Sequence, residues 1–116
     1  MDGPPNYVEN HAFQDRWPLS PEAKAAGEAA AGPVRAALDD LRQRRLTQDT
    51  VRDALVGLGY TTAQIELRGE TQPIDYGIRL PGRGACIHGM VTAGQVSVNV
   101  EGPAMEGSCI TPQGGH

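Results

Sequence analysis

Three segments in the C-terminal half of the chain alternate apolar and polar residues, and this alternation constrains the fold more than any other feature. The segments are residues 74–80, 85–92 and 95–101. Short turn sequences separate them, PGRG at residues 81–84 and Ala93-Gly94, which predicts that neighbouring segments pair as antiparallel strands. A slip of one residue would move all the apolar side chains of a strand to the other face, so the pattern also predicts one register.

In that register Leu80 faces Ala85 and Thr92 faces Gln95. The apolar side chains then align in three rows, Ile78-Ile87-Val100, Tyr76-Gly89-Val98 and Ile74-Val91-Val96. We expect the Tyr76 ring to cover Gly89, as aromatic side chains do for strand glycines. The opposite face carries Arg79-Cys86-Glu101, Gly77-His88-Asn99 and Asp75-Met90-Ser97.

Helical sequence precedes these strands. A first helix is predicted from Pro21, with Ser20 as N-cap, and Gly32-Pro33 either kinks or restarts it. A second helix is predicted after Thr47 and ends near Gly57 and Gly59. A further strand, with Ile65 and Leu67 on one side, follows it.

The chain has 116 residues, which is enough for one small domain with a modest core. We expect residues 1–20 to form an extended or disordered lead-in, residues 21–110 the domain and residues 111–116 a C-terminal tail. The predicted fold class is α+β. Two N-terminal helices pack on one face of a four-stranded antiparallel meander sheet that carries one disulfide.

The two cysteines, Cys86 and Cys109, lie at the start of the last hairpin and just beyond its end. A disulfide explains this placement best, and closing such a loop would stabilise the fold by about 3 kcal/mol. A redox pair or a metal-binding pair remains an alternative. Disulfides persist in oxidising compartments, so the cysteines indicate an exported protein that is secreted or sits in the cell envelope.

No apolar run is long enough to span a membrane, and the residues after Met1 do not resemble a signal peptide. To reconcile this with export, we expect that Met1 is an introduced start and that the precursor carries an export signal or a lipid anchor. The net charge of −4 gives no basic surface for nucleic acid.

Aromatic residues are concentrated in the lead-in, which is unusual for a spacer. They are Tyr7, Phe13 and Trp17. Either they dock on the protein's own core or belong to a linker, or they form a segment that binds a partner.

The sheet face not covered by helices is the candidate binding surface. Its predicted residues are Arg79, His88, Met90, Ser97 and Asn99. We expect His88 to hydrogen-bond Asn99. A soft-metal site for copper can be assembled from Cys86, His88, Met90, Met105 and Cys109, and a hydrolytic group from Ser97, His88 and Asp75. Neither outweighs a plain binding surface, and no catalytic residue, metal or cofactor is predicted.

One resemblance bears on location. The run LTQDTVRDALVGLGY, then CIHGMVTAGQVSVNV and GSC, resembles small exported or lipoprotein domains of actinobacteria of undefined function. The matching positions are Gly59-Tyr60, Cys86 to Gly89 and Gly107 to Cys109. The resemblance covers about residues 47–110, implies an envelope location and a structural disulfide, and brings no catalytic residues.

The sequence therefore predicts a non-enzymatic, extracytoplasmic binding or interaction domain whose partner is an unknown protein or small molecule. The alternative is a small envelope enzyme or copper-binding protein that uses the same sheet face.

Overall fold

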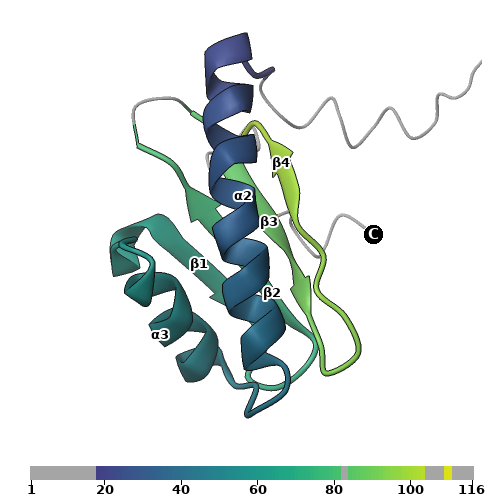
Figure 1. Ribbon diagram of the computed structural model, residues 1–116. Coiled ribbons are helices and arrows are strands. Elements are labelled where there is room, and N and C mark those ends of the chain that lie inside the picture. The colour runs from purple at the N-terminus through teal and green to yellow at the C-terminus, as the bar shows by residue number, and fades with distance from the viewer. Residues whose placement is uncertain (1–17, 82–83, 104–108, 111–116) are drawn as a thin grey trace, which may run out of the picture.

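The structure is a computed structural model in which residues 18–81, 84–103 and 109–110 are described. Its elements are α2 (Pro21–Leu41), α3 (Gln48–Gly57), a short 3-10 helix η1 (Thr62–Gln64), β1 (Ile65–Arg68), β2 (Ile74–Arg79), β3 (Cys86–Val91) and β4 (Asn99–Glu101). Both α-helices lie on the same face of the sheet, with the long α2 running across it (Figure 1). The predicted α+β architecture is confirmed.

The sheet is an antiparallel meander in the order β1-β2-β3-β4. Ile78 pairs with Ile87, and Ile87 with Val100, as the alternation predicted. The two turns close as expected, because the Leu80 N–H donates to the Ala85 carbonyl at 2.9 Å. The Thr92 N–H donates to the Gln95 carbonyl, also at 2.9 Å. The register is therefore confirmed for the central strands.

The fourth strand is shorter than predicted. Regular pairing begins only at Asn99, after an isolated bridge between Val91 and Val96. Between them the chain approaches Gly89 so closely that a Cβ on Gly89 would lie 2.0 Å from the Ser97 carbonyl oxygen. That oxygen accepts a hydrogen bond from the Tyr76 hydroxyl at 2.8 Å. The atoms nearest to a Cβ at Gly89 therefore belong to Ser97, and Tyr76, the direct cross-strand partner of Gly89, reaches the same place with its hydroxyl.

α2 begins as predicted, because the Ser20 hydroxyl accepts a hydrogen bond from the Ala23 N–H at 3.1 Å. It then continues through Pro33 to Leu41, so a restart at Gly32-Pro33 is wrong. The helix buries side chains on both sides of the proline, including Ala23 and Leu38. Packing on the sheet therefore outweighs the one hydrogen bond that Pro33 cannot donate.

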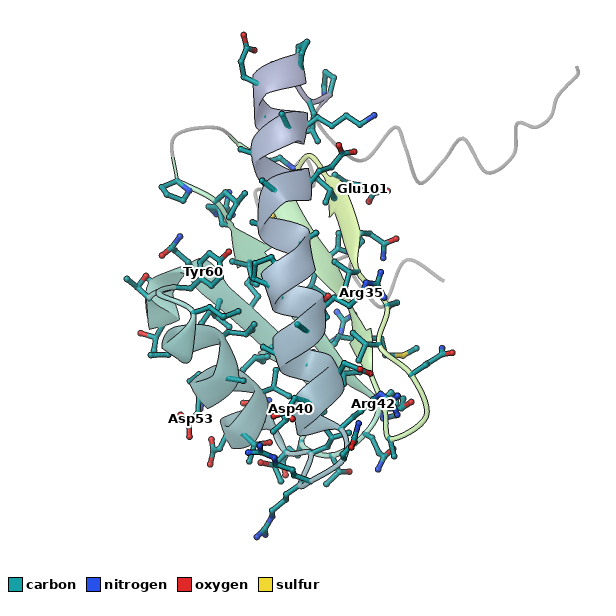
Figure 2. The ribbon with its side chains drawn as sticks, viewed as in Figure 1. Arg35, Asp40, Arg42, Asp53, Tyr60 and Glu101 are labelled. Atoms are coloured by element: carbon teal, nitrogen blue, oxygen red, sulfur yellow. A yellow bond between two sulfur atoms is a disulfide. The ribbon has the colours of Figure 1, made fainter. Side chains whose placement is uncertain are left out.

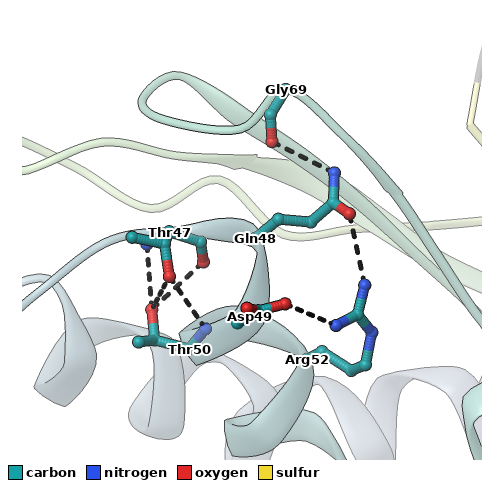
Figure 3. Close-up of polar contacts among 6 residues, drawn as sticks. All are labelled: Thr47, Gln48, Asp49, Thr50, Arg52 and Gly69. Atoms are coloured by element: carbon teal, nitrogen blue, oxygen red, sulfur yellow. Dashed lines mark hydrogen bonds and ion pairs between the residues drawn. The ribbon is translucent and has the colours of Figure 1, made fainter.

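α3 is held at its first turn by reciprocal capping (Figure 3). The Thr47 hydroxyl accepts from the Thr50 N–H at 3.1 Å, and the Thr50 hydroxyl accepts from the Thr47 N–H at 2.9 Å. The Gln48 amide donates to the Gly69 carbonyl, and this contact ties the helix start to the β1–β2 loop. The N-cap predicted at Thr47 is confirmed.

The core lies between the helices and the inner face of the sheet. Its fully buried large side chains are Tyr76, Leu38, Leu55, Ile74, Ile78, Ile87, Val34, Val51 and Val91. α2 approaches β4 closely at Gly27, where a Cβ would lie 2.4 Å from Cγ1 of Val100. With the inner face fully used for packing, the opposite face is left for function.

The buried Tyr76 hydroxyl predicts a loss of stability at high pH. Burial raises the pKa of Tyr76 well above its ordinary value of 10, and the nearby Arg35 charge opposes this only in part. The unfolded state therefore releases a proton that the folded state keeps. Below pH 10 this group has no effect, and above pH 10 the free energy of unfolding falls by up to about 1.4 kcal/mol per pH unit.

Tyr76→Phe should remove this contribution to the decrease of the free energy of unfolding with pH. Urea unfolding of the wild type and the variant between pH 8 and 11 measures the decrease for each protein. Burial also raises the pKa of Tyr60, so the comparison is the difference between the two slopes. Equal slopes in the two proteins would contradict the prediction.

Candidate binding surface

The face of the sheet opposite the helices carries the candidate site, and it is partly covered by the chain itself. Cys86 forms a disulfide with Cys109, as predicted, and both are fully buried. Cys109 and Ile110 lie across β2 on this face. A Cβ on Gly77 would stand 2.9 Å from the Cys109 Cβ and 3.0 Å from Cγ1 of Ile110. Because Gly77 has no side chain, the Cys109–Ile110 segment can pack directly against the strand at this position.

Glu66 on β1 holds the same segment by hydrogen bonds. Its carboxylate accepts from the Cys109 N–H at 2.9 and 3.0 Å and from the Ile110 N–H at 3.2 Å. Arg79 lies beside this carboxylate, with 3.9 Å between Nη2 and Oε2. Arg79, predicted as part of the binding surface, thus contacts the group that attaches the Cys109–Ile110 segment.

A second ion pair crosses β1 and β2 on the same face. Arg68 and Asp75 are direct cross-strand partners, and both Nε and Nη2 of Arg68 donate to Oδ2 of Asp75 at 3.1 Å. Both side chains are partly exposed. The pair presents one positive and one negative group next to β3.

His88 has a different side-chain partner from the one expected. Its Nε2 lies 2.8 Å from Oε1 of Glu101. Asn99 instead donates from its amide to the His88 backbone carbonyl at 3.2 Å. Asn99 is directly opposite His88 across the strands, so its amide can reach the backbone. The ring reaches diagonally to the longer carboxylate side chain.

A hollow of about 210 Å³ opens between these groups. It is lined by Arg68, Asp75, Tyr76, His88, Gly89, Met90, Ser97 and Ile110. His88, Met90 and Ser97 were predicted for the binding surface and are brought together here, whereas Arg79 and Asn99 do not line it. Sequence reasoning missed Arg68 and Ile110. The glycine at position 77, inside a strand, was the signal that another segment lies against this face.

The three residues of the imagined hydrolytic group line the same hollow but contact other groups. Oγ of Ser97 accepts a hydrogen bond from the Met90 N–H at 2.9 Å. His88 contacts Glu101, and Asp75 contacts Arg68. These are not the partners that a nucleophile, a base and an orienting acid require of one another.

The copper site loses its two thiolates, because both sulfurs are in the disulfide. His88 and Met90 share the hollow, and Met105 lies outside the described residues. Within residues 18–81, 84–103 and 109–110, no group of three or more His, Cys, Asp or Glu side chains is arranged to hold a metal ion. The aromatic lead-in residues Tyr7, Phe13 and Trp17 also lie outside the described part of the chain.

Among the helices described, none combines the length and the apolar character needed to cross a bilayer. Comparison with known proteins gives no match. No family model fits the chain, and neither the curated proteins nor the solved structures contain a significant relative. The geometry of the outer face therefore carries the functional argument.

Proposed function

We propose that this chain is an extracytoplasmic binding domain that recognises its partner with the hollow on the outer face of the sheet. The observation that carries the proposal is the composition of this hollow. Its lining combines an ion pair, Arg68 with Asp75, with Met90 and His88. Charged groups of both signs together with apolar side chains are typical of recognition sites.

The rigidity of the surroundings supports the proposal. The hollow is formed by residues of β1, β2 and β3, by Ser97 in the segment before β4, and by Ile110. The Ile110 backbone is held by Glu66, and its neighbour Cys109 is tied to β3 by the disulfide. A surface that is ordered before binding loses little conformational entropy when a partner docks. The contacts of Ser97, His88 and Asp75 described above favour binding over acyl transfer.

The location is proposed from the disulfide. A buried disulfide in a small domain fits an oxidising compartment, and the protein is proposed to be secreted or lipid-anchored in the cell envelope. We propose that residues 47–110 resemble exported actinobacterial domains, which would imply the same location.

Site-specific crosslinking in the native cells tests both parts of the proposal. A photoreactive benzophenone amino acid is placed at Met90 in the hollow or, as a control, at Glu28, which is exposed on α2. We expect a discrete crosslinked product from position 90 only, in the envelope or the culture medium. Adding Arg68→Ala should lower its yield about tenfold, because one member of the ion pair is lost.

The same products from positions 90 and 28 would contradict the proposed surface. Recovery of the protein from the cytoplasm with free thiols would contradict the proposed location. Arg68 and Asp75 are partly exposed, so the variant is expected to lose at most about 1 kcal/mol of stability and to remain folded.

A further inference from the structure

A second concave site lies on the other side of the molecule, between α2 and the loop that joins β3 to β4. The groove has a volume of about 420 Å³. Its charged lining residues are Arg35, Arg42 and Asp39 on α2, and its apolar ones include Ala36 and Val96. Figure 2 shows Arg35 and Arg42 on the same side of the helix. They are seven residues apart, about two helical turns.

Arg35 is exposed and lacks a carboxylate partner. Its contact is a hydrogen bond of 3.4 Å from Nη1 to the Val96 carbonyl, and within the described part of the chain its other donors have no partner. Arginines 42, 44, 52 and 68, in contrast, each pair with an aspartate at 3.1 Å or less. The contact with Val96 places the guanidinium at the groove and leaves its charge unbalanced.

Arg42 marks the other end of the groove and is already held in place. Its Nε lies 2.6 Å from Oδ1 of Asp39, and its Nη1 donates to the Ala93 carbonyl at 2.8 Å. Asp39 is therefore engaged with Arg42, and the groove keeps a net charge of about +1 in a protein whose net charge is −4. Within the described residues, the side-chain amide of Gln95, on the groove wall, has no hydrogen-bond partner.

We propose that this groove binds a small organic oxyanion, a carboxylate or a phosphate monoester, with its anionic group on Arg35 and a short apolar body on Ala36 and Val96. A guanidinium presents a planar fork of donors that matches both oxyanions. The Gln95 amide supplies a further donor at the rim. The volume lies within the range of small-molecule sites.

Titration followed by amide NMR tests this site. The probes are butyrate and propyl phosphate at constant ionic strength, with butyramide as the neutral analogue. We expect saturable shifts at Gly94, Gln95 and Val96 for at least one anion, and the anion that saturates identifies the headgroup. Arg35→Gln should weaken binding at least tenfold, as expected for the loss of a charge-assisted pair.

Arg44→Gln is the matched control, because Arg44 pairs with Asp40 and lies outside this groove. It should leave binding unchanged. Shifts that stay linear, equal weakening by the two variants, or equal binding of butyramide would each overturn the proposal. Arg35 is exposed and makes one long hydrogen bond, so its variant is expected to fold. The outer-face crosslinking experiment is independent of this result.

Discussion

Replacing Cys86 and Cys109 together with alanine is expected to lower the free energy of unfolding by about 3 kcal/mol. The disulfide joins residues 23 apart in the sequence, and a loop of this length restricts the unfolded chain by about that amount. Both cysteines are also fully buried, so some packing is lost as well. Urea unfolding of the oxidised wild type and the double variant, each extrapolated to zero denaturant with its own m-value, measures the difference. The m-value of the variant should be the larger, because its unfolded chain is no longer crosslinked.

Glu66→Gln separates the covalent link from the hydrogen bonds that hold the same segment. It removes the carboxylate charge that accepts from the Cys109 and Ile110 N–H groups but keeps the disulfide and one amide oxygen. The expected loss is about 1 kcal/mol. A loss below 1 kcal/mol for the double alanine variant, or a loss no larger than that of Glu66→Gln, would contradict the ranking.

The register of the sheet could be predicted because it follows from local features. In three segments joined by short turns, apolar residues alternate with polar ones. Only one register of the three strands buries Ile78, Ile87 and Val100 on the same face. The disulfide follows from the same register, since Cys86 stands at the open end of the hairpin. The helix starts at Ser20 and Thr47 were predictable for a similar reason, because capping depends on residues three apart.

The details of the outer face could not be predicted in this way. Alternation places Arg68, Asp75 and His88 on one face but does not say which polar side chain reaches which partner. His88 contacts Glu101 diagonally, and the direct neighbour Asn99 bonds the backbone. The segment that crosses Gly77 is distant in sequence from the strands it covers. Its position depends on the disulfide and on Glu66 together.

The groove beside α2 was also missed. Nothing in the sequence singles out Arg35. In the structure Arg42 bonds the Ala93 carbonyl of the β3–β4 loop, which brings the loop next to the helix. Such contacts depend on where a loop lies relative to a helix, which helical periodicity does not determine.

Gly89→Ala is expected to destabilise the protein by about 3 kcal/mol. The φ angle of Gly89 is not in the positive range, so the cost comes from space. A Cβ at this position would lie 2.0 Å from the Ser97 carbonyl oxygen and 2.7 Å from its carbon, and backbone must move to accommodate it. Overpacking of this kind costs about 1–3 kcal/mol, and displacing Ser97 also weakens its bond with Tyr76, worth about 1 kcal/mol.

Gly57→Ala is the matched control, because a Cβ at that position in α3 would meet no atom within 4 Å beyond its chain neighbours and the backbone of its own helix. It should leave stability unchanged or raise it by up to about 1 kcal/mol, through the better helix propensity of alanine. Each variant adds one methyl group to the wild type. Chemical denaturation of the two therefore compares how the surroundings of each methyl group change the free energy of unfolding. A change in stability of less than 0.5 kcal/mol for both variants would contradict this prediction. Ser97 would then not lie against Gly89, where its backbone shortens β4 and where it lines the hollow.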